Sequence, residues 1–77
     1  MRANRAYELL VHRQGRFFRP SDKLEQVEVI EIDTGETILF WDTRPRDTGK
    51  LARALRADLA RMEADEFVEH WRRYEVS

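Results

Sequence analysis

Histidine side chains are the first candidates for chemistry in this chain, because an imidazole can carry a proton near neutral pH or bind a metal ion. The sequence has two, His12 and His70. On a helix, Glu66 and His70 would share one face at a spacing of four residues, which could begin a metal site. A zinc site needs three or four protein ligands, and no third ligand accompanies this pair. We therefore expect an acidic surface face carrying a histidine, with no bound metal.

Nucleophilic and acid–base catalysis have little support in the residue types. The chain contains no Cys, and its two serines, Ser21 and Ser77, stand in a predicted turn and at the last position. Its three glycines are too dispersed to cradle a phosphate. The sequence predicts no catalytic residues, no cofactor and no enzymatic activity. The clustered carboxylates are typical of a charged helix start, and they are Glu63, Asp65, Glu66 and Glu69.

One stretch, residues 12–19, combines arginines with two adjacent aromatic rings. Nucleic-acid surfaces use cations to contact phosphates and exposed rings to stack on bases. On a strand, however, Phe17 and Phe18 would point to opposite faces, so at least one of them would belong to a core. Nucleic-acid binding is therefore the alternative hypothesis for this chain. Its candidate residues are Arg13, Arg16, Phe17 and Arg19.

The charge distribution disfavours both a nucleic acid and a membrane as partners. The formal net charge is −1, but residues 1–23 carry six basic and two acidic groups, whereas residues 24–47 carry two basic and seven acidic groups. The acidic segment would repel a phosphate backbone. The longest aliphatic or aromatic run, residues 38–41, is four residues long, against about 20 for a membrane-spanning helix. With no apolar leader and no Cys, we expect a cytoplasmic protein.

The elements that must carry these residues are organised around a β-hairpin predicted over residues 26–43. Two runs rich in β-branched and aromatic residues flank a turn that contains Gly35. We prefer a three-residue loop, 33–35, because it places this glycine where positive φ is needed. A two-residue loop, 34–35, would shift the pairing by one residue. The preferred loop predicts the cross-strand pairs Ile32–Glu36, Glu31–Thr37, Ile30–Ile38, Val29–Leu39, Glu28–Phe40 and Val27–Trp41.

Both faces of this predicted hairpin carry bulky apolar side chains. A sheet with one solvated face should alternate apolar and polar residues along its strands, and these strands do not. Each face of the sheet therefore needs a cover. In the preferred register one face holds Val27, Val29, Leu39 and Trp41, and the other holds Ile30, Ile32, Ile38 and Phe40.

The segment before the hairpin is compatible with two structures. Apolar residues alternate over 7–11 as in a strand, but residues 5–14 also fit one face of a helix. We favour the strand, because a turn at residues 14–15 would lead into a short second strand at 17–19. We expect residues 1–4 to be frayed.

Two helices are predicted after the hairpin. The first covers about 48–62, with Asp47 or Thr48 as its N-cap. Two apolar stripes follow one another along this part of the chain. If one continuous helix carried both, the second stripe would lie about 135° around the helix axis from the first. That offset predicts a break, with Asp65 capping a second helix over about 65–74, in preference to one long helix that packs on both sides. The first stripe is Leu51, Leu55, Leu59 and Met62, and the second is Phe67, Trp71 and Tyr74.

These patterns together predict an α+β fold in a single small domain, residues 1–77. An antiparallel β-meander of three to four strands is followed by two C-terminal helices. In one arrangement the first helix covers one face of the sheet, and the second covers the other face or its edge. In the other arrangement an aromatic patch stays exposed and recruits a partner, because two short helices can hardly seal both faces.

The second arrangement carries the functional hypothesis. Trp and Tyr are favoured anchors at protein interfaces, and a small chain with an exposed apolar patch is suited to self-association. The sequence therefore predicts a small non-enzymatic protein–protein interaction or regulatory protein, acting on a protein partner or as a homodimer. The candidate interaction residues are Trp41, Phe67, Trp71 and Tyr74.

Overall fold

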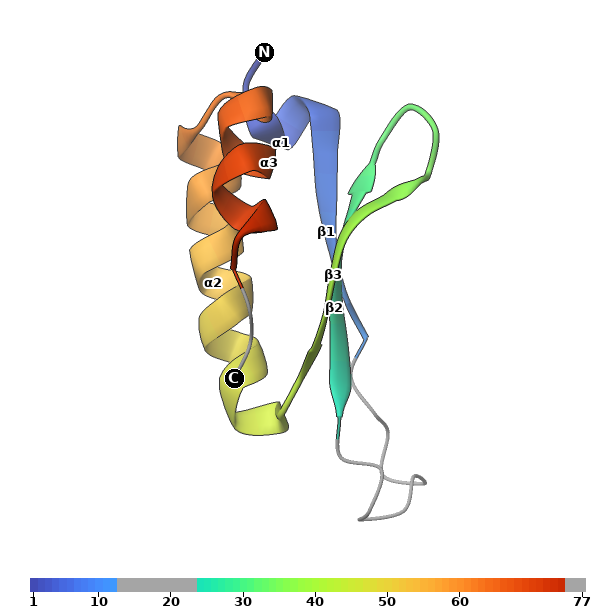
Figure 1. Ribbon diagram of the computed structural model, residues 1–77, viewed down its shortest axis with the longest axis vertical. Helices are drawn as coiled ribbons and strands as arrows, with labels where there is room; N and C mark the ends of the chain where they lie inside the picture. Colours follow the sequence, from blue (N-terminus) through green and yellow to red (C-terminus); the bar gives the residue numbers. More distant parts are fainter. Residues whose placement is uncertain (13–23, 75–77) are drawn as a thin grey trace.

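The computed structural model describes residues 1–12 and 24–74, and it shows a three-stranded antiparallel sheet followed by two helices (Figure 1). The strands lie in the order β1-β2-β3. This arrangement confirms the predicted α+β meander with two C-terminal helices. In chain order the elements are α1 (Ala3–Ala6), β1 (Tyr7–His12), β2 (Glu25–Glu31), β3 (Thr37–Thr43), α2 (Pro45–Arg61) and α3 (Ala64–Arg72).

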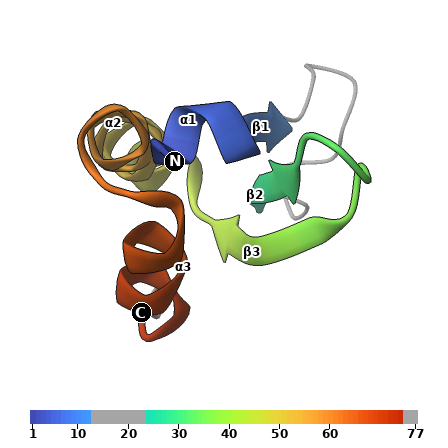
Figure 2. The same ribbon diagram turned by 90° about the horizontal axis from the view of Figure 1, so that it is seen from above.

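Both C-terminal helices lie on the same side of the sheet (Figure 2). Helix α2 packs against β1 and β2, and α3 packs against β3. The arrangement with one helix on each face is therefore wrong for this chain. The residues that fill the space between helices and sheet include Val27, Val29 and Trp41 from the strands. None of the helices in residues 1–12 and 24–74 lies over the opposite face of the sheet.

The hairpin of β2 and β3 keeps the predicted register over most of its length. Val29 lies opposite Leu39, and Glu28 opposite Phe40. Close to the turn the prediction is wrong by one residue, because a β-bulge between Val29 and Ile30 shifts the pairing. Five residues, 32–36, separate the two strands, and a hydrogen bond from the Glu31 N–H to the Glu36 carbonyl encloses a four-residue loop, 32–35. The positive φ predicted for Gly35 is confirmed, at 74°.

Helix α2 begins earlier than predicted. Arg44 is its N-cap and Pro45 occupies the first turn, where the missing N–H of proline costs nothing. Thr48, predicted as a cap, is instead a buried residue within the first turns. Its hydroxyl donates to the Arg44 carbonyl at 3.1 Å and lies 2.7 Å from the Thr43 hydroxyl. The two threonines therefore join the end of β3 to the start of α2.

The predicted break between the two helices is confirmed, at Met62. The cap is Glu63 and not Asp65, because Glu63 and Glu66 form a reciprocal capping box, which satisfies two backbone N–H groups at the helix start. Asp58 of α2 also accepts a hydrogen bond from the Trp71 indole N–H at 3.0 Å. Phe67 and Trp71 of the second stripe face the core from this separate helix, whereas Tyr74 lies beyond the end of α3 at Arg72, earlier than the predicted end at residue 74.

The N-terminal residues are packed, contrary to the expectation that residues 1–4 are frayed. Ala3 is fully buried, and its N–H donates to the Met62 carbonyl at 2.9 Å. The strand prediction for the following segment is confirmed over Tyr7–His12, which pairs with β2 along its whole length. The predicted turn at 14–15 and the short strand at 17–19 lie outside the described residues.

Candidate interaction surface

An aromatic cluster marks the junction of β3 and α3. The Trp41 and Trp71 rings meet edge to face at 5.9 Å, and the Tyr74 ring lies 5.1 Å from Trp71. The Trp41 indole N–H donates to the Tyr74 carbonyl at 3.2 Å, so the end of α3 is fixed to the strand by one polar contact and by ring packing. The cluster holds α3 beside the outermost strand of the sheet.

The predicted interaction residues fall into two groups within this junction. Phe67 is fully buried, and Trp41 and Trp71 are 8% and 6% exposed. Tyr74 is 44% exposed. Since a side chain must be accessible to anchor a partner, Tyr74 is the member of the set that presents substantial surface in the isolated chain.

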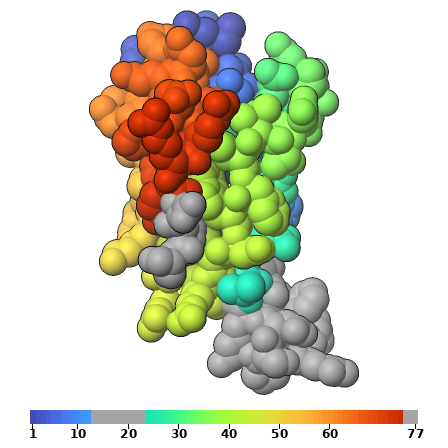
Figure 3. All heavy atoms as spheres, viewed as in Figure 1, coloured from blue at the N-terminus to red at the C-terminus, as the bar shows by residue number. Residues whose placement is uncertain are grey.

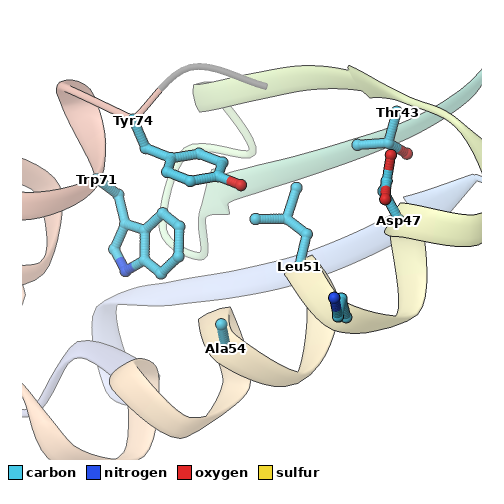
Figure 4. A pocket seen from close by; sticks show the side chains of 7 residues that line it. Thr43, Asp47, Leu51, Ala54, Trp71 and Tyr74 are labelled. Carbon is cyan, nitrogen blue, oxygen red and sulfur yellow. The ribbon is translucent and has the colours of Figure 1, made fainter. Parts of the chain in front are cut away.

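A pocket of about 420 Å³ lies between the start of α2 and the end of α3 (Figure 4). The rings of Trp71 and Tyr74 form one wall, and Leu51 stands across from them. Asp47 and Thr43 supply oxygen atoms at the far end. The pocket combines this ring wall with the Asp47 carboxylate and the Lys50 ammonium group, a mixture suited to holding a small polar side chain of a partner.

A second hollow, which we call the β3-edge groove, runs along the free edge of β3 and has a volume of about 540 Å³. Five consecutive residues of β3 line it, and successive residues of a strand point to opposite faces, so the groove follows the edge of the strand. Figure 3 shows this strand, coloured yellow-green, uncovered beside α3, coloured red. The lining residues are Ile38, Leu39, Phe40, Trp41, Asp42, Trp71, Arg72 and Tyr74.

The face of the sheet opposite the helices, which we call the open face, mixes apolar and acidic side chains. Phe40 on this face is 49% exposed, and Leu10 and Ile30 are half-buried. Acidic groups alternate with them, so no wholly apolar patch forms. Across the three strands the rows of this face are Glu8–Ile30–Thr37, Leu10–Glu28–Phe40 and His12–Gln26–Asp42.

Glu28 lies at the centre of the open face and is held by two neighbours. Its Oε1 accepts a hydrogen bond from the Thr37 hydroxyl at 2.7 Å, and its Oε2 lies 2.7 Å from His12 Nε2. The Thr37 hydrogen bond, followed by the His12 contact, lowers the pKa of Glu28 from its ordinary value, since both favour the charged carboxylate. The network therefore keeps a fixed negative charge at the middle of this face.

Metal binding and membrane crossing can be examined in the parts of the chain that the structure describes. Over residues 1–12 and 24–74, no three His, Cys, Asp or Glu side chains gather as a metal site would need. Within the same ranges no helix has the length and apolar character needed to cross a bilayer. The nucleic-acid candidates lie outside the described residues, and they are Arg13, Arg16, Phe17 and Arg19.

Phe40 and the edge of β3 are the features that sequence reasoning did not single out. The signal was present in the register, because Phe40 was correctly paired with Glu28, and a carboxylate directly opposite a ring indicates a face that meets water. The exposure of one strand edge, by contrast, depends on the strand order and on the position of α3. Neither can be read from periodicity.

Comparison with known proteins adds no further constraint on this surface. The surface has three features: the accessible Phe40 ring on the open face, the β3-edge groove and the pocket beside Tyr74. A functional assignment has to come from that geometry, because the chain matches no protein-family model, no curated protein and no solved structure.

Proposed function

We propose that this protein is a small non-enzymatic interaction protein, which binds a protein partner through the side of the sheet formed by β3 and the open face. One observation supports this proposal above the others. Both helices pack on the same side of the sheet, so no helix of the described residues covers Phe40 and its half-buried neighbours. We also propose a cytoplasmic location, in keeping with a sequence that has no Cys.

The chemistry of the surface supports a protein partner. A ring surrounded by polar groups is a common form of interface anchor, because the ring supplies buried area and the polar rim supplies specificity. Three carboxylates lie on the open face, those of Glu8, Glu28 and Asp42. They would oppose a phosphate backbone and would suit a partner that presents basic or neutral side chains.

The proposal is tested by introducing a photoreactive phenylalanine analogue, p-benzoylphenylalanine, at position 40 and irradiating the protein in lysate of its host cell. The matched control carries the same analogue at Arg56, an exposed position on α2. We expect a discrete adduct from position 40 and none from position 56. Excess unlabelled wild-type protein should suppress the adduct, and excess Phe40→Lys protein should not.

The proposal is supported if the wild-type competitor suppresses the adduct and the Phe40→Lys competitor does not. That difference shows that the partner recognises the surface around Phe40. Equal adducts from both positions, or equal suppression by both competitors, would count against the proposal. A mass measurement of the adduct distinguishes a copy of this chain from a different protein.

A further inference from the structure

Strand β3 is an edge strand without the usual protection against pairing. An edge strand presents unpaired backbone N–H and C=O groups, and proteins guard such edges with lysines, prolines, bulges or covers. β3 has the sequence Thr-Ile-Leu-Phe-Trp-Asp-Thr, with one charged residue and no Lys, Pro or Gly. Its bulge lies at the end next to the turn, which leaves residues 39–43 regular.

Helix α3 extends the helix layer past this edge. Figure 2 shows α3 beside β3 and projecting beyond the outermost strand. The β3-edge groove is bounded by β3 on one side and by Trp71, Arg72 and Tyr74 on the other. A further strand placed along β3 would therefore find a partial cover for its inner face already in position.

We propose that this place is taken by β3 of a second copy of the chain, paired antiparallel across a two-fold axis perpendicular to the sheet. Such an axis keeps the open faces of both copies on the same side, so directly opposed residues must come from the same face of the strand. β3 runs from Thr37 to Thr43. The register that overlaps all of it is centred on Phe40, and the product is a continuous six-stranded sheet.

Charge and side-chain type favour this self-pairing. In the register centred on Phe40, each Phe40 meets its counterpart, and such aromatic cross-strand pairs are stabilising. Asp42, the charged residue of the strand, lies opposite Ile38 and not opposite itself. Arg72, which lines the same groove, brings a positive charge to each half of the interface. No like charges are opposed along the strand.

The size of the interface sets the expected affinity. A seven-residue strand spans about 24 Å at roughly 3.4 Å per residue. Pairing along that length, with the groove residues, gives an interface toward the small end of the range for specific complexes. We therefore expect a dimer with a dissociation constant on the order of micromolar, in exchange with the monomer.

This inference rests on the proposed function, since it names the partner for the same surface. Sedimentation of the full chain from about 1 µM to 1 mM should show a monomer–dimer equilibrium. Phe40→Lys should weaken the dimer by at least about tenfold, because it opposes two ammonium groups at the axis. Ile32→Lys is the matched control, since Ile32 is equally exposed but lies in the hairpin loop, and it should leave the equilibrium unchanged.

The register is tested by disulfide trapping, which is unambiguous because the chain has no Cys. Phe40→Cys should form a cross-linked dimer under mild oxidation, since opposed residues of an antiparallel pair lie within disulfide range. Asp42→Cys alone should not. A mixture of Asp42→Cys and Ile38→Cys chains should cross-link to each other.

The outcomes separate this inference from the function on which it rests. If the chain stays a monomer at 1 mM, or if Asp42→Cys cross-links to itself as readily as Phe40→Cys, the β3 dimer is wrong. The chain could stay a monomer while the analogue at position 40 captures a different protein, with the competition expected above. That result overturns the dimer and leaves the proposed function standing. A monomer without such capture overturns both.

Discussion

Glu28 shows how one residue can prepare a surface for binding without being part of the core. Its carboxylate is only 18% exposed although it lies on the open face, and both of its oxygens are engaged by Thr37 and His12. A charge held in this way loses little freedom when a partner covers it, because its hydrogen bonds are already made. The open face is therefore preorganised at its centre.

The lowered pKa of Glu28 makes a prediction about acid stability. A carboxylate whose pKa is lowered on folding contributes stability above its unfolded value of about 4.5 and loses that contribution as the pH falls through the folded value. Glu28→Gln should cost about 1 kcal/mol at pH 7, and the difference from wild type should shrink in acid. Urea unfolding at a series of pH values measures this difference.

The control for this experiment is Glu8→Gln, which removes an exposed carboxylate from the same face. As a surface substitution it should change the free energy of unfolding at pH 7 by less than about 0.5 kcal/mol. A loss for Glu28→Gln that is the same at pH 7 and in acid would show that the network does not stabilise the charged form.

At the scale of the element, the β2–β3 hairpin absorbs a mismatch between its loop and its strands. The four-residue loop sets one register and the buried side chains set another, and the bulge at Val29/Ile30 reconciles them. A bulge costs little near a turn, where the strands are already strongly twisted. The loop still depends on Gly35, because its φ of 74° is a conformation that other residues adopt only with strain.

Two alanine substitutions separate backbone strain from packing. A Cβ at either Gly35 or Gly49 would meet no atom within 4 Å, so neither change creates a clash. Gly35→Ala should cost about 1 kcal/mol through its positive φ. Gly49→Ala, within α2, should raise stability by about 0.5–1 kcal/mol. The urea midpoint should therefore fall for Gly35→Ala and rise for Gly49→Ala. Shifts of the same sign would show that the positive φ of Gly35 does not decide the effect.

At the scale of the whole molecule, the core that the described residues form lies on one side of the sheet. Ala3, Phe67 and the buried face of α2 all converge there with Val27 and Val29. For a chain of 77 residues, total stability is expected at about 4–12 kcal/mol. The loss of a single large core side chain is therefore a substantial part of the total.

Two phenylalanine truncations measure how one-sided the molecule is. Phe67 is fully buried, so Phe67→Ala should cost about 3–5 kcal/mol and lower the unfolding temperature markedly. Phe40→Ala, at a half-exposed ring on the open face, should cost less than about 1 kcal/mol. Thermal unfolding followed by circular dichroism compares them. Similar losses of stability for Phe67→Ala and Phe40→Ala would mean that the open face is covered in the isolated chain.

The parts of the fold that follow from periodicity could be predicted, and those that depend on how layers stack could not. The offset between the two apolar stripes predicted a break close to Asp65, since a continuous helix cannot turn its buried face, and the structure has the break at Met62. Periodicity shows which face of α3 is buried, but it does not show on which side of the sheet that face packs. Ala3 gave no signal because one small residue has no period.

The same distinction applies to the candidate interaction surface. The pairing of Phe40 with Glu28 followed from the preferred register, which places Gly35 where positive φ is needed, whereas the two-residue loop would have shifted that pairing by one residue. That Glu63 and not Asp65 caps α3 could not be predicted, since either side chain can accept a hydrogen bond from a backbone N–H at a helix start. The free edge of β3 required the strand order, which is a property of the assembled sheet.

The placement of the two tryptophans gives the molecule a built-in optical reporter. Trp41 and Trp71 are the only indoles in the chain, and their rings touch across the contact between β3 and α3. Tryptophan fluorescence therefore reports on the packing of α3 against the strand. A displacement of α3 would separate the two rings and alter the emission. Binding along β3 could in this way be followed without any label.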